Sequence, residues 1–257
     1  MAAGTVKLEV RNRVAYVTLD NPEKRNAISD EMSAQLASHF DTIESDPEIR
    51  VAVITGAGDI AFSAGGFIPG YVMKNLLGVE GAGFQERIPK PDGRKVYIAA
   101  INGYCLAGGF GLALACDLRI AASHAKIGAS AMKLGVIAGA QQSQRLIRLI
   151  PFAKALELML MANHVSGDEA ERLGLINAVV PGEQLMATAT AWAERIASFS
   201  PLAVQGTKNL CYEGAHLSLE DALRLEGEAF MASTRTADAL EGFTAWTEGR
   251  APDFKGR

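Results

Sequence analysis

The sequence predicts an α/β fold, and three observations lead to that prediction. Short apolar stretches of strand length, such as residues 51–55, alternate with helix-like segments in the first half of the chain. Two of these stretches run directly into glycine pairs, Gly65-Gly66 and Gly108-Gly109. From residue 141 onward the pattern is mainly helical. Because 257 residues can form one large core, we expect one principal domain.

The first fifty residues predict a hairpin followed by an amphipathic helix. Residues 6–19 alternate apolar and polar side chains around Asn12-Arg13, as two antiparallel strands do around a tight turn. Asn21-Pro22 then breaks the pattern, and Ser29 or Asp30 can cap a helix. One face of that helix would carry Met32, Leu36, Phe40 and Ile43.

The longest apolar stretch, residues 96–116, could cross a bilayer by length alone. However, Asn102-Gly103 interrupts it, and glycines weaken helix formation in its second half. We therefore predict a strand, a turn and a buried helix over residues 110–116. Later helices are predicted over residues 153–161, 185–199, 201–212, 219–231 and 237–248, with one late strand over 175–180.

Composition and charge exclude several function classes. The formal net charge of −4 gives no general attraction for nucleic acid or anionic lipid, so we expect neither a nucleic-acid nor a membrane partner. The three cysteines and four histidines are scattered without metal-ligand spacing, so no metal site is expected. The N-terminus lacks a signal-peptide pattern, and we expect reduced thiols in a cytoplasmic protein.

The two glycine-pair turns indicate the chemistry. Glycine allows positive φ and close approach of a ligand to the main chain, and a helix N-terminus adds unpaired N–H donors. If residues 61–66 and 101–109 come together, they could hold one oxyanion, such as the enolate oxygen of a thioester. The alternative is that both glycine pairs only allow a helix to pack closely on a strand.

Residues 69–95 differ from the rest of the chain. They combine scattered glycines, Pro89, Pro91 and mixed charge. We predict a mobile segment over the site with one helix over residues 71–77. A plain surface insertion is the alternative, since loops of this length are often but not always lids.

Five short motifs follow one another along the chain in a specific order and spacing. They are Asn21-Pro22-Glu23-Lys24-Arg25-Asn26-Ala27, residues 61–66, Ala99-Ala100-Ile101-Asn102-Gly103, Gly108-Gly109 followed by Ala115-Cys116-Asp117, and Pro252-Asp253-Phe254-Lys255. With this set, nearly the whole chain resembles the enoyl-CoA hydratase/isomerase, or crotonase, family. The resemblance implies a crotonase-like ββα spiral that binds acyl-CoA over residues 1–195, and a helical C-terminal trimerisation region over residues 196–257. It also implies an acyl-CoA substrate, no further cofactor, and a homotrimer or a dimer of trimers.

The resemblance assigns roles to four residues near the turns. The backbone N–H groups of Gly66 and Gly108 would bind the thioester oxygen, which agrees with the chemistry expected of the glycine turns. Lys24 and Arg25 would lie along the CoA phosphates, where cations form charge-assisted hydrogen bonds. The alternative for this pair is a solvated basic turn.

Further positions of the resemblance concern the nucleotide and the acyl group. Phe230 would approach the adenine from a neighbouring subunit, although a helical Phe is more often a core residue. Arg250 lies one place beyond the family's basic position near the nucleotide phosphate, and an exposed Arg is more often only solvated. An apolar acyl pocket would include Phe67, Ile68, Tyr71, Met132 and Ile137, and Ala27 and Ala64 would also contact the substrate.

The chain departs from the family's pattern where proton transfer is expected. Hydratases of the family use two glutamates, and the corresponding positions in this chain are Gly111 and Ala131, neither of which can move a proton. Gly139 and Phe67 likewise stand where relatives carry acidic residues. No Asp or Glu lies between Asp117 and Glu157. The remaining polar candidates near the expected pocket are Tyr104, Ser130, Lys133, Gln141, Gln142, Glu80 and Glu86.

These features leave three functions open. The first is an enoyl-CoA hydratase or isomerase with rearranged catalytic residues. The second is an acyl-CoA decarboxylase or C–C lyase, in which the substrate supplies the electrons once the enolate is stabilised. The third, of another class, is a non-catalytic acyl-CoA binding protein.

Overall fold

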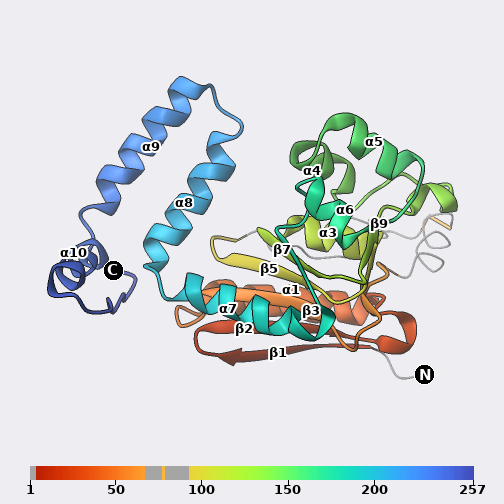
Figure 1. The fold of residues 1–257 in the computed structure, drawn as a ribbon, viewed down its shortest axis with the longest axis horizontal. Helices are drawn as coiled ribbons and strands as arrows, with labels where there is room; N and C mark the ends of the chain where they lie inside the picture. The colour runs from red at the N-terminus through yellow and green to blue at the C-terminus, as the bar shows by residue number, and fades with distance from the viewer. Residues whose placement is uncertain (1–3, 67–76, 79–92) are drawn as a thin grey trace.

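In a computed structural model that describes residues 4–66, 77–78 and 93–257, the chain winds into two sheets surrounded by helices (Figure 1). The larger sheet has the strand order β1-β2-β3-β5-β7-β10, and the smaller sheet has the order β4-β6-β8-β9. This architecture confirms the predicted α/β class. The strands are β1 (Thr5–Arg11), β2 (Val14–Asp20), β3 (Val51–Gly56), β4 (Ala61–Ser63), β5 (Val96–Ile101), β6 (Tyr104–Leu106), β7 (Leu118–Ala122), β8 (Lys126–Gly128), β9 (Val165–Ser166) and β10 (Ala178–Val180).

The helices lie on both sides of the sheets and continue into a long C-terminal extension. The helices are α1 (Asp30–Ser45), α3 (Gly108–Ala115), α4 (Gln142–Leu149), α5 (Phe152–Leu160), α6 (Gly167–Arg172), α7 (Leu185–Ala197), α8 (Pro201–Gly214), α9 (Leu219–Ser233) and α10 (Ala237–Glu248), with 3₁₀ turns at Pro22–Lys24, Ala131–Leu134 and Gly182–Gln184.

The segment predicted as a mobile lid, with its helix over residues 71–77, lies outside the described residues except for 77–78 and 93–95.

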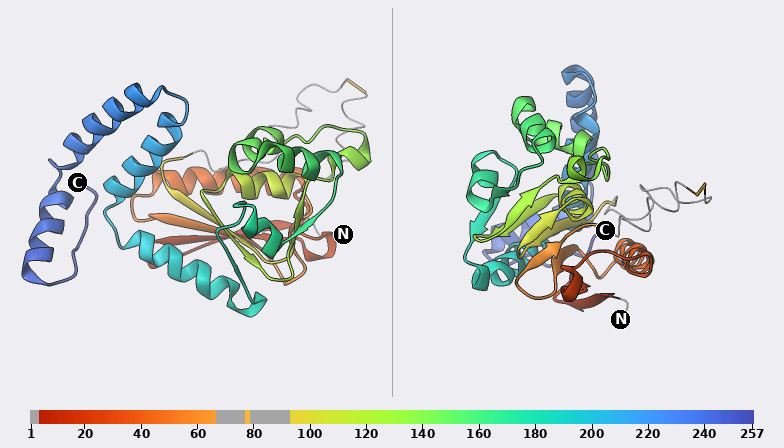
Figure 2. Two further views of the ribbon diagram at one scale, coloured as in Figure 1. Left: turned by 45° about the horizontal axis from the view of Figure 1, so that its top comes forward. Right: turned by 90° about the vertical axis from the view of Figure 1, so that its right-hand side faces the viewer.

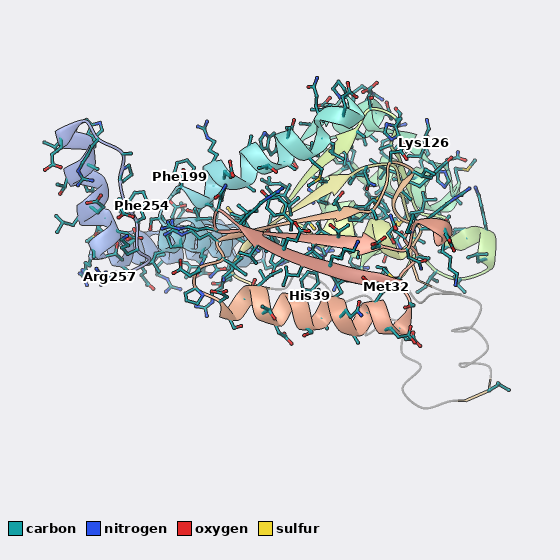
Figure 3. The ribbon with its side chains drawn as sticks, turned by 90° about the horizontal axis from the view of Figure 1, so that it is seen from below. Met32, His39, Lys126, Phe199, Phe254 and Arg257 are labelled. Atoms are coloured by element: carbon teal, nitrogen blue, oxygen red, sulfur yellow. The ribbon has the colours of Figure 1, made fainter. Side chains whose placement is uncertain are left out.

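The predicted N-terminal hairpin and helix are both confirmed. β1 pairs antiparallel with β2, and Asn12 and Arg13 both have positive φ, as a two-residue hairpin turn requires. The Ser29 hydroxyl caps α1 by accepting a hydrogen bond from the Met32 N–H at 3.2 Å. Figure 3 shows Met32 and His39 on this helix beneath the strands. The four predicted apolar positions of α1 are all buried.

Successive turns of the chain each contribute one strand to each sheet. β3, β5 and β7 are parallel neighbours in the larger sheet, while β4, β6 and β8, which follow them, are parallel neighbours in the smaller one. Every residue of α3 is buried, so residues 96–116 form strand, turn and buried helix as predicted. Within the described residues, no helix is long and apolar enough to cross a bilayer.

The Asn102 side chain joins the β5–β6 turn to the β3–β4 turn by hydrogen bonds. Its side-chain NH₂ donates to the backbone carbonyl oxygens of Gly56, Gly58 and Ala61 at 2.9, 2.7 and 3.1 Å. Its side-chain oxygen, Oδ1, accepts from the Gly56 N–H at 3.2 Å. A Cβ placed on Gly103 would lie 2.1 Å from the Ile60 carbonyl oxygen. The Asn-Gly pair of the third motif is therefore the corner that stacks the β5–β6 turn on the β3–β4 turn.

The late strand is shorter than predicted. The sequence predicts an extended segment over residues 175–180, but only Ala178–Val180 pairs with β7. The N–H groups of Leu175 and Ile176 instead donate back to the Ala170 carbonyl, and Gly174 has φ +79, as at the end of a helix. The side chains of Leu175 and Ile176 are buried in the core. Their backbone follows the C-terminus of α6 and is not part of a strand.

The C-terminal helices form an arm, α8 to α10, that leaves the core after α7 (Figures 1 and 2). Arg50 ties its base to the sheet by donating to the carbonyl oxygens of Ala197 and Phe254 at 2.9 and 2.5 Å. Asp117 accepts from Lys208 at 3.0 Å and from Tyr212 at 2.9 Å, which joins α8 to the end of α3. Figure 3 labels Phe199 at this joint, and Phe254 and Arg257 farther along the arm.

Candidate active site

The two glycine turns meet in direct backbone contact. A Cβ placed on Gly65 would lie 2.7 Å from the backbone nitrogen of Gly108. A Cβ placed on Gly109 would lie 2.4 Å from the carbonyl oxygen of Ser63. A side chain at either position would push the turns apart, so the contact depends on glycine.

The hydrogen bonds of the first turn fix the direction of the Gly66 N–H group. The Gly65 carbonyl accepts from the Ile28 N–H at 2.8 Å, and the Gly65 N–H donates to the Ser63 hydroxyl at 3.1 Å. The peptide bond between Gly65 and Gly66 is trans, because no described residue has a cis peptide. The Gly66 N–H therefore points to the side opposite the Gly65 carbonyl, away from Ile28.

The second turn presents the N-terminus of α3. Gly108 is the first residue of this helix, and the first-turn N–H groups of a helix have no intrahelical acceptor. α3 has no side-chain cap and no acidic residue in its first turn. The partial positive charge at this helix end is therefore not compensated by the helix itself, which favours an oxyanion beside Gly108.

Ala107, the residue before Gly108, has φ +49 and ψ −124, a conformation that favours glycine. We expect Ala107→Gly to increase the free energy of unfolding by about 1 kcal/mol, because relief of this strain exceeds the added entropy of the unfolded chain. Urea denaturation of both proteins measures the difference. A loss of stability would show that Ala107 is not strained.

Ser63 and Asn26 support the first turn from behind. The Ser63 hydroxyl donates to the Asn26 carbonyl at 2.8 Å while it accepts from Gly65. The Asn26 side chain donates to the carbonyl oxygens of Ala57 and Ala61 at 3.0 and 2.6 Å, and both Ser63 and Asn26 are fully buried. Sequence reasoning missed these roles, although both residues lie inside the first two of the five motifs.

If the turns hold a thioester oxygen, as the resemblance implies, Ser63→Ala is expected to lower thioester turnover about 10-fold. The Gly65 N–H and the Asn26 carbonyl would lose the hydroxyl that joins them. The free energy of unfolding should fall by about 1–3 kcal/mol for the same reason. Ser45→Ala is the matched control, since the Ser45 hydroxyl is exposed and bonds only within α1. Equal kcat for wild type and Ser63→Ala, measured at saturating thioester, would contradict this role.

The basic loop at Lys24-Arg25 borders the first turn. The Arg25 carbonyl accepts from the Ala64 N–H at 2.9 Å, so the loop and the turn share a hydrogen bond. The Arg25 guanidinium lies over the Tyr104 ring, 5.2 Å from its centroid, and both cations are exposed. Ala27 and Ala64 are half-buried on the same two segments. The structure thus gathers these four predicted residues around Gly66.

The two positions expected to lack glutamates are small and closely packed. A Cβ placed on Gly111 would lie 2.3 Å from the Ala140 carbonyl oxygen and 2.8 Å from the Ala140 Cβ. Ala131 is buried, and Met132 beside it is half-buried. Gln142 is buried with its NH₂ bonded to the Gly139 carbonyl at 2.8 Å, while Lys133 is exposed.

The remaining predicted residues lie away from the turns or outside the described part. Phe230 is 63% exposed on α9, in the arm. Arg250 forms a bidentate pair with Glu241, with both bonds under 3 Å, and a further bond to Glu248. The Arg250 hydrogen bonds lower the pKa of Glu241 to about 2. Residues outside the described part are Phe67, Ile68, Tyr71, Glu80 and Glu86.

The cysteines do not supply a nucleophile to this site. All three are free thiols, and burial raises the pKa of Cys116 to about 12 and also raises that of Cys105. Cys211 is exposed on α8, in the arm. Across the described ranges, no group of His, Cys, Asp and Glu side chains could hold a metal ion.

Comparison with known proteins identifies the family. A model of the enoyl-CoA hydratase/isomerase family matches residues 9–257. The chain belongs to this family. A crystal structure of enoyl-CoA hydratase from Bacillus anthracis superposes with a TM-score of 0.89 at 33% identity, covering 98% of this chain and all of that one. The enoyl-CoA hydratase from Mycobacterium tuberculosis H37Rv gives a TM-score of 0.89 at 34% identity, covering 98% and 99% of the two chains. The predicted crotonase-like fold with a helical C-terminal region is thereby confirmed.

Two sequence relatives of this family member have named activities. It is 41% identical to (E)-benzylidenesuccinyl-CoA hydratase from Thauera aromatica, over 98% of this chain and 99% of that protein. It is 35% identical to short-chain-enoyl-CoA hydratase from Clostridium acetobutylicum, over the full length of both. The similarity extends through core and arm alike.

Proposed function

We propose that this protein adds water to a 2-enoyl-CoA thioester whose carbonyl oxygen is held by the N–H groups of Gly66 and Gly108. The observation that carries the proposal is the backbone contact between the two glycine turns. The relatives named for (E)-benzylidenesuccinyl-CoA and for short-chain enoyl-CoA support hydration as the reaction. They also support a CoA thioester as the substrate.

The two N–H groups would act on the transition state more than on the substrate. When water adds to the β-carbon, the electrons of the double bond move toward the thioester carbonyl, and its oxygen becomes negative. Donors that are fixed by the fold stabilise this charge without reorganisation, by about 3–4 kcal/mol for each donor. The uncapped N-terminus of α3 adds to this effect.

The CoA part would lie along the Lys24-Arg25 loop. Both side chains are exposed, and the loop is hydrogen-bonded to Ala64 beside Gly66. Cations at these positions can form charge-assisted bonds with the CoA phosphates. In this proposal Phe67, Ile68, Tyr71 and Met132 would surround the acyl group. Ile137, which the resemblance also puts there, is 84% exposed. Coenzyme A would be part of the substrate and not a separate cofactor.

We also propose that the arm packs against further copies of this chain, as a homotrimer or a dimer of trimers. No residue of α8 or α9 is buried within the subunit. An arm with this much exposed apolar surface favours a partner. In such an assembly Phe230 would reach a neighbour's nucleotide, and light scattering would test the oligomeric state. The exposed large hydrophobic side chains of the arm are Leu202, Tyr212, Leu217, Leu219, Leu223, Phe230, Met231, Leu240, Phe243 and Trp246.

A second candidate is a decarboxylase or C–C lyase acting on an acyl-CoA. It is favoured by Gly111 and Ala131, because cleavage of a carboxyl or an aldol-type bond leaves its electrons on the α-carbon and needs no carboxylate that activates water. A non-catalytic acyl-CoA binding protein would need the same oxyanion donors only for affinity.

One experiment separates these functions. Purified protein is mixed with (E)-benzylidenesuccinyl-CoA, cinnamoyl-CoA, crotonyl-CoA, a 3-hydroxyacyl-CoA and malonyl-CoA, and loss of the enoyl absorbance or release of product is followed. We expect hydration of an enoyl thioester. Turnover of malonyl-CoA alone would favour the decarboxylase, and binding without any turnover would favour the binding protein.

A further inference from the structure

In the part of the chain that the structure describes, the side of the proposed thioester site next to Gly111 consists of backbone and methyl groups. Gly111 lies one helical turn beyond Gly108, and its Cα is covered by the Ala140 carbonyl and methyl. Residues 129–131 directly follow β8, which pairs with β6 next to the second turn. Ala129 and Ala131 are buried there. None of these groups can accept a proton from water.

Two carboxylates near the C-terminal end of α3 accept hydrogen bonds from other residues of the protein. Asp117 accepts hydrogen bonds from Lys208, from Tyr212 and from the Tyr97 N–H at 2.8 Å. Glu44 accepts from the Tyr97 hydroxyl at 2.9 Å and from the Arg94 N–H at 3.0 Å. Asp117 follows the C-terminal end of α3, and Glu44 of α1 lines the same hollow as residues 114–117. Gly108 begins α3 at the opposite end of this helix, which is about 12 Å long. Neither can reach water at a thioester bound by Gly108.

A substrate anion would meet no like charge where α3 and α4 begin. Neither helix has an acidic residue in its first turn. Moreover, residues 118–156 contain no Asp or Glu at all. A negatively charged acyl group is therefore not repelled by this part of the wall.

We infer that the substrate brings the missing carboxylate: an enoyl thioester with a carboxymethyl group on its α-carbon, whose free carboxylate accepts the proton of the attacking water. This inference rests on the proposed hydratase function. A succinyl thioester with an alkylidene or arylidene group has this constitution when its double bond is conjugated with the thioester. The carboxylate and the β-carbon are then held on one small framework, so the base is already in position.

The step balances without a co-reactant. The water oxygen bonds to the β-carbon, its proton passes to the substrate carboxylate, and the double-bond electrons form the thioester enolate held by Gly66 and Gly108. The new carboxylic acid then returns the proton through a water molecule to the α-carbon, and the thioester carbonyl re-forms. The net change is addition of one water across the double bond.

The test compares (E)-benzylidenesuccinyl-CoA with the methyl ester of its free carboxylate. We expect kcat for the ester to be lower by about 10²- to 10⁴-fold, the range for loss of a general base. A drop confined to KM would mean that the carboxylate only binds, and it would overturn the inference. Hydration of the ester at a kcat close to that of the acid would overturn it as well.

The pH dependence supplies a second readout. With the acid substrate, kcat should fall below the ordinary pKa of a carboxylic acid, about 4–5, and the ester should lack this limb. The same limb with both substrates would place the base on the protein. A Glu80→Gln or Glu86→Gln variant that hydrates the acid substrate more than about 100-fold more slowly than wild type would also place the base on the protein.

The failure of this inference can be told apart from the failure of the proposed function. If neither benzylidenesuccinyl thioester is hydrated while crotonyl-CoA is, only this inference fails. If no enoyl thioester is hydrated, the proposed function itself fails.

Discussion

Replacing Gly65 with alanine is expected to lower kcat for thioester hydration by about 10²- to 10³-fold, the loss associated with one oxyanion donor. The new methyl group would lie 2.7 Å from the Gly108 nitrogen, so one turn must move away from the other. The two N–H groups could then no longer bind the same oxygen. Steady-state kinetics at saturating thioester, with circular dichroism to verify folding, measures this effect.

Gly58→Ala is the matched control for that variant. Gly58 also has positive φ, +77 against +97 for Gly65, but a Cβ placed there has no atom within 4 Å. Both variants should lose about 1 kcal/mol of stability from the strained backbone. Only Gly65→Ala should lose activity. Similar kcat values for the two variants would show that the contact between the turns is not needed for turnover.

The Gly111→Ala variant is expected to lose about 3 kcal/mol in free energy of unfolding. Its methyl group would lie 2.3 Å from the Ala140 carbonyl oxygen, and α3 is buried along its whole length, so the helix cannot easily shift. Urea denaturation of the purified variant measures the loss.

Gly206→Ala serves as the comparison for Gly111→Ala. Gly206 is also helical, but a Cβ placed there meets no atom within 4 Å. Alanine should therefore raise stability by about 0.5–1 kcal/mol through helix propensity. If Gly111→Ala were as stable as wild type, the wall beside the thioester site would have room for a side chain. Close packing against Ala140 would then not explain why position 111 carries no carboxylate.

The local elements of the fold could be predicted from the sequence because their signals are short-range. Asn12-Arg13 marked the hairpin, Ser29 marked the start of α1, and Asn102-Gly103 divided the apolar stretch into strand and helix. The glycine pairs also predicted two turns able to approach each other. For each of these features the decisive residues lie within a few positions of the element they shape.

Roles that depend on distant partners could not be predicted in the same way. Asn26 holds the carbonyl oxygens of residues 57 and 61, and Asn102 holds those of residues 56, 58 and 61. Nothing in the local pattern says which carbonyls a buried amide will meet. The predicted late strand is too long for a related reason, since Leu175 and Ile176 have strand-like side chains but donate to the Ala170 carbonyl.

We propose that two backbone N–H groups, from Gly66 and Gly108, bind one thioester oxygen. A crystal structure with an unreactive acyl-CoA analogue tests it most directly through the two nitrogen-to-oxygen distances. We expect both distances to be about 2.7–3.1 Å. The opposite result would be a bound analogue whose thioester oxygen lies beyond hydrogen-bonding distance of one or both nitrogens. That result would contradict the oxyanion role of Gly66 and Gly108.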